Sequence, residues 1–236
     1  MDTLPLPLAQ FGEAVVDFFF PCRCVGCGKV GEFLCASCCQ KLPRLLPPFC
    51  RKCGKPESSG GLCATCWGRQ AEIDGIRSPF RFDGVIRRAI HELKYHNLKA
   101  LSAYLAKLLA VYLQANPVPG EILAPVPLYP RRLRERGYNQ SSLLARELGK
   151  VIGLPVVEDS LYRFKDSPPQ ARTTTVEARR RNVADAFTCR EQRLNGKRVL
   201  LVDDVCTSGA TLEACAATLK AAGAASVWGL TLARET

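Results

Sequence analysis

Four Cys-x-x-Cys pairs fall within the first 70 residues, and they constrain the fold more than any other feature of the chain. The pairs are Cys24/Cys27, Cys35/Cys38, Cys50/Cys53 and Cys63/Cys66. Tetrahedral zinc takes four thiolates at about 2.3 Å, and each such turn supplies two of them, so two pairs complete one site and four complete two. The pairs bring no histidine or carboxylate that would hold an activated water. We therefore expect two closed, structural zinc sites.

A redox role or a role as reduced structural thiols fits the spacing of the cysteines less well than zinc binding. A redox Cys-x-x-Cys motif would occur once beside a βαβ pattern rather than four times, and reduced structural thiols need no such spacing. The spacing does not decide whether each zinc takes successive or interleaved pairs. Cys22 and Cys39 are further candidate ligands of the first site.

The chain is basic, with 33 Lys and Arg against 22 Asp and Glu and a formal charge of +11. This favours a polyanionic partner, which can be nucleic acid, a phosphorylated small molecule or an acidic membrane surface. The start of the chain has neither a basic leader nor an apolar run of about 18 residues, so we expect a cytoplasmic protein without a transmembrane segment. A short amphipathic helix is predicted from Leu8, Phe11, Val15, Phe18 and Phe19.

The residue pattern changes near position 75. We expect an N-terminal helix and double zinc-ribbon domain over residues 1–72, a linker over 67–80, and a second domain over 75–236. Strands are predicted at 80–84, 121–128, 197–204 and 225–233, and helices at 85–96, 100–114, 141–153 and 214–223. Because strands alternate with helices, the second domain is predicted to be α/β, with a mainly parallel sheet flanked by helices.

Residues 199–211, VLLVDDVCTSGAT, lead a buried strand directly into two aspartates. Ligands bind at the carboxyl ends of strands in open α/β sheets, which is where Asp203 and Asp204 would emerge. The turn after them offers backbone N–H groups, three hydroxyls and a glycine that lets a phosphate approach closely. A sugar phosphate fits this arrangement, with its hydroxyls or a Mg²⁺ ion on the carboxylates. The alternative is that the aspartates only cap the next helix.

The same thirteen residues resemble the phosphoribosyl pyrophosphate (PRPP) signature of type I phosphoribosyltransferases. The order of the paired cysteines, IHELKY, PVPLYPRRLRERGYNQ, SPPQARTTTVEARRRNVADAF and this signature resembles the ComF family of competence-associated phosphoribosyltransferase-like proteins over essentially the whole chain. The resemblance implies a type I phosphoribosyltransferase-like domain behind an N-terminal double zinc ribbon. It also implies Mg²⁺ on the two aspartates and PRPP bound by Asp203, Asp204, Val205, Cys206, Thr207, Ser208, Gly209, Ala210 and Thr211.

Arginines are the other candidate site residues. The resemblance implies that PVPLYPRR meets the pyrophosphate and that residues 170–182 form a mobile loop over the site, so Arg131 and Arg180 are expected to be catalytic beside the aspartates. The basic segment can neutralise a pyrophosphate or successive DNA phosphates, or it can be a solvated turn. It contains Arg131, Arg132, Arg134 and Arg136, with Tyr129 and Tyr138 beside them as residues that could stack on bases or belong to the core. His91 and His96 are expected to be ordinary helix residues.

Three functions are compatible with the sequence. The first is a competence protein that binds PRPP or a related sugar phosphate with Mg²⁺, and also single-stranded DNA, with a competence helicase as a candidate partner. The second is a metabolic phosphoribosyltransferase with an unidentified acceptor, and the third is a non-catalytic PRPP-sensing regulator. The sequence shows no recognisable purine or pyrimidine pocket, and it lacks the catalytic cysteine and glutaminase domain of an amidophosphoribosyltransferase.

Overall fold

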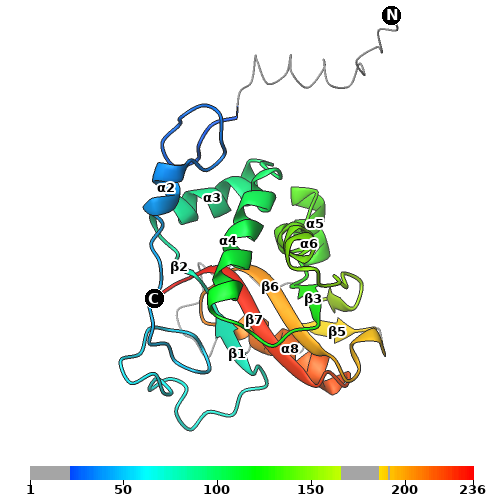
Figure 1. The fold of residues 1–236 in the computed structure, drawn as a ribbon. Coiled ribbons are helices and arrows are strands. Elements are labelled where there is room, and N and C mark those ends of the chain that lie inside the picture. Colours follow the sequence, from blue (N-terminus) through cyan, green and yellow to red (C-terminus); the bar gives the residue numbers. More distant parts are fainter. Residues whose placement is uncertain (1–21, 166–185, 191) are drawn as a thin grey trace, which may run out of the picture.

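A five-stranded parallel sheet forms the centre of the computed structural model, which describes residues 22–165, 186–190 and 192–236 (Figure 1). The strand order is β1-β7-β6-β3, and β2 extends the line of β1 along β7. The strands are β1 (Gly75–Arg77), β2 (Phe80–Arg81), β3 (Ile122–Pro125), β6 (Arg198–Cys206) and β7 (Ser226–Arg234). The expected parallel α/β architecture is therefore confirmed.

Both faces of the sheet are covered by helices, because the central strands are apolar on both sides. In β6, Leu200 and Val202 belong to one hydrophobic cluster, whereas Val199 and Leu201 belong to the other. The first cluster contains residues of α3 (Gly84–Tyr95), α4 (Leu101–Ala115) and α6 (Gln140–Ile152). The second contains residues of α8 (Ala210–Ala221). Figure 1 shows α8 on the opposite side of the sheet from α4 and α6.

Local capping residues set the ends of these helices. The Asp83 carboxylate accepts a hydrogen bond from Gly84 N at 2.7 Å, and the Asn139 side chain accepts one from Ser141 N at 3.0 Å. Gly153 ends α6 in the left-handed conformation at φ 71°. The basic segment that the sequence left open as a solvated turn is a short helix, α5 (Pro130–Arg136).

Several elements differ from the sequence-based expectation. The expected linker over 67–80 contains β1, β6 continues two residues beyond the predicted strand end, and α8 begins four residues before the predicted helix. A small antiparallel pair, β4 (Leu161–Arg163) and β5 (Phe187–Cys189), was not predicted, and neither was the 3₁₀ turn η2 (Gln192–Leu194). The predicted N-terminal helix and the predicted loop over 170–182, including Arg180, lie outside the described residues.

Two cysteine modules pack on different parts of this α/β unit (Figure 1). The first module, residues 22–42 with α2 (Ala36–Gln40), lies on α3, where Arg88 Nη2 donates to Gly26 O at 3.1 Å. The second module, residues 49–67, lies on the sheet edge, where Ile76 N donates to Lys52 O at 2.8 Å. The buried guanidinium of Arg234 donates to the Cys53 carbonyl. Among the described helices, none combines the length and the apolar character needed to cross a membrane.

Candidate functional site

Each cysteine module gathers four thiols into one group. Within each group the sulfur atoms lie within 4.8 Å of one another, and the members are Cys24, Cys27, Cys35 and Cys38 in the first and Cys50, Cys53, Cys63 and Cys66 in the second. The Cys27 and Cys35 sulfurs are 3.6 Å apart, so successive pairs share a site and interleaved pairing is excluded. Cys22 and Cys39 belong to neither group.

Backbone N–H groups around these thiols favour the thiolate form that zinc requires. Cys35 N donates to Cys24 Sγ at 3.4 Å, and Cys63 N donates to Cys50 Sγ at 3.3 Å. Burial opposes ionisation of Cys50, but the backbone donors outweigh it and lower its pKa to about 6. Four converging thiols, at least one of which has a lowered pKa in each module, fit a closed, four-coordinate structural zinc.

A cleft of about 640 Å³ opens at the carboxyl end of β6. Its walls come from the end of β6, the loop into α8, the segment after β3, α5, and the last turn of α3. Of the nine residues predicted to bind PRPP, all except Ser208 line this cleft. The Ser208 hydroxyl instead accepts a hydrogen bond from Ala210 N at 3.3 Å.

Both aspartates of the signature reach the same side of the sheet. Ser141 Oγ of α6 donates to Asp203 Oδ1 at 2.8 Å, and Lys94 Nζ of α3 lies 2.6 Å from Asp204 Oδ1. Adjacent residues of a regular strand point to opposite faces. Here the alternation shifts at the aspartates, because Val205 packs against the same hydrophobic cluster as Val202. The shift explains how two consecutive carboxylates enter one cleft.

The charges and contacts around Asp203 and Asp204 leave one carboxylate oxygen, Asp204 Oδ2, available to a ligand. Burial and the adjacent Asp204 carboxylate raise the pKa of Asp203 to about 7. Burial alone would lower the pKa of Lys94, but the attraction of Asp204 outweighs it and the net shift is upward. Asp204 Oδ2 is buried, and it has no hydrogen-bond partner among the described residues. A buried oxygen without a partner calls for an explanation, and at the wall of a cleft a ligand or ion that completes it supplies one.

The loop after β6 has the backbone form of an anion site. Gly209 adopts φ 77° and stands at the N-cap of α8, and an added Cβ there would lie 3.1 Å from Ile76 Cδ1. The conformation and the tight contact both favour glycine. The first N–H groups of the 12-residue α8 have no carbonyl partner within the helix, and Thr207 and Thr211 add hydroxyls at the cleft wall.

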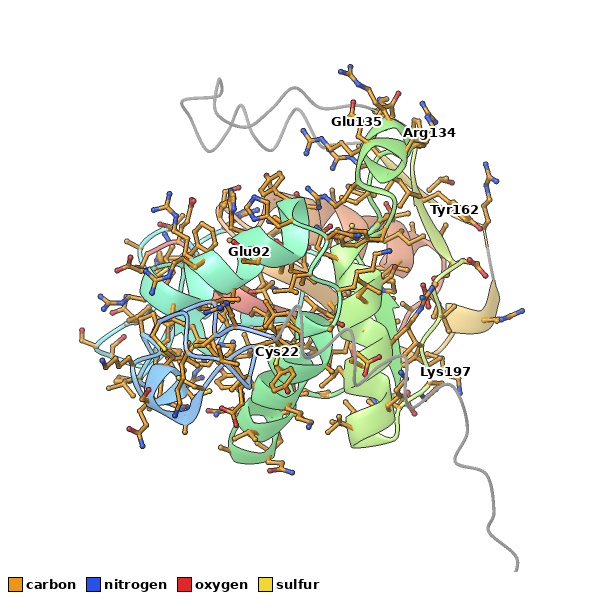
Figure 2. The ribbon with its side chains drawn as sticks, turned by 90° about the horizontal axis from the view of Figure 1, so that it is seen from above. Cys22, Glu92, Arg134, Glu135, Tyr162 and Lys197 are labelled. Carbon is orange, nitrogen blue, oxygen red and sulfur yellow. The ribbon has the colours of Figure 1, made fainter. Side chains whose placement is uncertain are left out.

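The four arginines of α5 divide between two faces. Arg132 and Arg136 line the cleft, whereas Arg131 and Arg134 do not. Arg131 Nε binds Glu135 Oε1 at 2.8 Å, and Figure 2 shows Arg134 projecting away from the body of the molecule. Residues four apart lie on the same face of a helix, which explains why Arg132 and Arg136 both line the cleft. Tyr138 is a core residue whose hydroxyl donates to Leu93 O.

Sequence reasoning missed three residues of the cleft. Lys94 and Ser141 hold the two aspartates, and Arg163 of β4 joins the arginines of α5 at the wall. Lys94 belongs to the IHELKY segment and Ser141 to the predicted helix that became α6. Both segments were named from the sequence, but no role was assigned to either residue. His91 and His96 are exposed at the end of α3, as expected, and His96 Nδ1 lies 2.9 Å from Glu92 Oε2.

Family comparisons agree with the fold and the cysteine groups. A model described as "Double zinc ribbon domain" matches residues 15–73, and one described as "Phosphoribosyl transferase domain" matches residues 134–235. Together with the parallel sheet, they define a type I phosphoribosyltransferase fold carrying an N-terminal double zinc ribbon with two structural zinc sites. A purine phosphoribosyltransferase structure from Pyrococcus horikoshii is 16% identical, with a TM-score of 0.35 over 56% of this chain and 80% of that one.

Relatives place the chain in one family. "Competence protein F" of Haemophilus influenzae is 30% identical over 230 residues, covering 90% of this chain and 97% of that protein. "DNA utilization protein YhgH" of Escherichia coli K12 is 28% identical over 210 residues, covering 84% and 89%. The chain therefore belongs to the ComF family of competence proteins.

Removing one thiol from either group should halve the zinc content. Cys35→Ser and Cys50→Ser should each lower bound zinc from about two ions per chain to about one, because three thiolates hold zinc far less tightly than four. Elemental analysis of the purified protein measures this directly. Cys39→Ser is the matched control and should keep both ions. Retention of both ions by Cys35→Ser would show that a neighbouring thiol replaces Cys35.

Asp203→Asn should stabilise the fold at alkaline pH. Because folding raises the Asp203 pKa from 3.8 to about 7, wild-type stability is lost as the pH rises through this window, and the amide has no such loss. The amide oxygen can still accept from Ser141. In magnesium-free buffer, the gain in unfolding free energy should be about 1–2 kcal/mol larger at pH 8 than at pH 5.5. Denaturant titration measures it, and Asp159→Asn, an exposed acid, should show no such trend.

Proposed function

We propose that the cleft binds PRPP, or a closely related sugar phosphate, together with Mg²⁺, and that this binding serves a competence-linked handling of single-stranded DNA. The observation that carries the proposal is the buried Asp204 Oδ2, which lacks a partner among the described residues, beside a loop suited to an anion in the same cleft. A carboxylate oxygen kept for a cation or hydroxyl, next to N–H groups suited to a phosphate, matches the two ends of a phosphorylated ribose.

The loop residues would bind the 5′-phosphate. The N–H groups at the start of α8 and the hydroxyls of Thr207 and Thr211 would donate to the phosphate oxygens, while Gly209 leaves room for them. Ser208 would act indirectly, since its hydroxyl already accepts from Ala210 N and steadies the turn. Val205 and Cys206 would contribute the wall beneath the ribose.

The aspartates fit Mg²⁺, which takes oxygen ligands and is commonly held by one or two carboxylates plus substrate phosphates. Asp203 and Asp204 would hold the ion directly or through the ribose hydroxyls. When bound, Mg²⁺ would neutralise the charge of the pyrophosphate oxygens. Lys94 would orient Asp204 through their ion pair, and Ser141 would orient Asp203 through its hydrogen bond.

The inner arginines of α5 are the best candidates for the pyrophosphate. Arg132 and Arg136 line the cleft, so we assign them the role that the sequence gave to Arg131. Arg136 is held by Gln140 Oε1 and lies over the Tyr95 ring at 5.3 Å, which fixes its direction. Guanidinium groups suit this ligand because they bind phosphate oxygens in a forked geometry. Arg180 is proposed on the resemblance alone.

The DNA role is supported by the names of the relatives and by the charge of the chain. Relatives are called competence and DNA utilization proteins, and the net charge of +11 favours a polyanion. Arg131 and Arg134 on the outer side of α5 would contact phosphates of a strand passing the cleft. A competence helicase is the partner that we propose for delivering or receiving that strand.

Transfer of the phosphoribosyl group to a nitrogenous acceptor is a second candidate function. The cleft also has apolar walls at Phe82, Leu128 and Val205, which a phosphate does not need and a flat ring would contact. If transfer occurs, pyrophosphate leaves ribose C1 and the acceptor nitrogen bonds to that carbon. Binding without release of pyrophosphate would favour the PRPP-sensing role instead.

Calorimetric titration with PRPP and Mg²⁺ tests the main proposal. Wild-type protein should bind saturably, and the Asp203→Asn/Asp204→Asn double variant should bind at least about tenfold more weakly, because it removes the carboxylates that receive the ion. Glu158→Gln, a carboxyl group paired with Arg146 outside the cleft, is the control. Assaying each endpoint for pyrophosphate separates binding from turnover. Wild-type protein that binds no PRPP would refute the proposed ligand.

The two faces of α5 should separate the two ligands. Arg132→Ala/Arg136→Ala should weaken PRPP binding by at least about tenfold, through loss of charge-assisted contacts. Arg131→Ala/Arg134→Ala removes the same charge and should leave PRPP affinity within about twofold, while weakening DNA binding and its salt dependence. Titration of the wild type and both double variants under one buffer condition makes the comparison. Equal effects of both pairs on PRPP would rule out the division.

A further inference from the structure

The small sheet formed by β4 and β5 has an outer face that its own folding does not require. Leu161 and Phe187 point inward and belong to the hydrophobic cluster under α8. Tyr162, between Leu161 and Arg163, is 37% exposed, and Phe164, just after the strand, is 52% exposed. Residues two apart on an extended chain face the same way, so the two rings share one side.

A basic side chain lies over each of these rings. The Arg190 guanidinium is 4.7 Å from the centroid of the Tyr162 ring, and Lys165 Nζ is 5.7 Å from that of Phe164. Arg190 is placed there by the antiparallel register, since its N–H donates to Ser160 O at 3.0 Å beyond the Leu161–Cys189 pair. Two exposed aromatic rings with two cations therefore stand together at one edge of the molecule.

This edge continues from the candidate site. Arg163, between Tyr162 and Phe164, lines the cleft together with Arg132 and Arg136. The strand β4 thus presents an arginine to the cleft and aromatic rings away from it. Figure 2 shows Tyr162 at the periphery on the same side of the molecule as Arg134 of α5. A chain of phosphates passing α5 would meet β4 next.

We propose that Tyr162 and Phe164 form a stacking platform for successive bases of single-stranded DNA, with Arg190 and Lys165 contacting the phosphates beside them. Aromatic rings accept every base because each base has a π-face, and basic neighbours track the backbone. The rise of an extended chain separates the Cα atoms of Tyr162 and Phe164 by about 6.6 Å, which suits an extended single strand rather than the stacked bases of a duplex. The proposal rests on the DNA role proposed above and gives it a surface.

The charge of this surface favours nucleic acid over a protein partner. Exposed aromatic rings alone would suit a protein or a nucleic acid. Here a basic side chain lies over each ring, and a chain with a net charge of +11 attracts a polyanion. The faces of the bases are stacked and inaccessible in a duplex, so the platform should bind single-stranded DNA more tightly than double-stranded DNA. A single strand is the occupant that uses both the rings and the charges.

Fluorescence anisotropy of a labelled oligo-dT with the full, zinc-loaded chain tests the platform. Tyr162→Ala and Phe164→Ala should each weaken binding roughly tenfold, with the salt dependence of affinity unchanged, because stacking releases no counterions. Tyr162→Phe keeps the ring and should bind as the wild type does. Arg190→Ala and Lys165→Ala should instead lower the slope of log affinity against log salt by about one each.

Tyr104→Ala is the matched control, since Tyr104 is also 37% exposed and lies near a lysine, but on α4. It should leave DNA affinity unchanged, and thermal melting of each variant checks that it folds. Wild-type affinity in both Tyr162→Ala and Phe164→Ala would overturn the platform while leaving the DNA role intact. Equal affinity for duplex and single strand, or a preference for oligo-rU, would also overturn it. No DNA binding by the wild type would remove the DNA role itself, whereas the PRPP titration stands independently.

Discussion

Two neighbouring carboxylates at the end of a buried strand need partners from the protein itself, and much of the fold is arranged to provide them. Strands β7 and β3 flank β6 and helices cover both faces of the sheet, so water alone cannot solvate Asp203 and Asp204. Lys94 from α3 and Ser141 from α6 supply a charge and a hydroxyl. Both helices must therefore lie on one face of the sheet with their ends at the cleft. Asp204 Oδ2 still lacks a partner within the part of the chain that the structure describes, and a ligand can offset the free-energy cost of burying it.

The cysteine modules depend on the α/β unit as well as on metal. The second module contributes only Cys50, Cys63 and Cys66 to a buried cluster of its own. Its other contacts run to the sheet through Ile76 and Arg234, and the first module shares a cluster with α3. Zinc replaces a core that so few residues cannot build, and the sheet gives each module a surface to pack on. Zinc binding and packing on the α/β unit therefore both stabilise each module.

Local signals were enough to predict the cysteine groups, the long helices and the strand before the aspartates. Contacts across the chain were not, because nothing near Lys94 indicates that it will meet Asp204. The segment of α5 was not predicted to be a helix and was left open as a solvated turn, although Pro130 at the first helical position and Gly137 after the last are typical of a helix. That helical period would have separated Arg132 and Arg136 from Arg131 and Arg134. The strands β4 and β5 have three residues each, too few for a pattern of alternation to show.

The pairing of β1 with β7 ties an early part of the chain to its last strand. A ribosome that has just finished β1 at Arg77 must add 148 residues before it reaches Ser226, where β7 begins. At typical elongation rates this takes roughly 7 to 30 s. Throughout that interval the second cysteine module lacks the strand that carries Arg234. Zinc binding is then the main interaction that can keep the module folded. The supply of zinc during translation therefore determines whether the module is folded or unfolded, with four free thiols, until β7 is made.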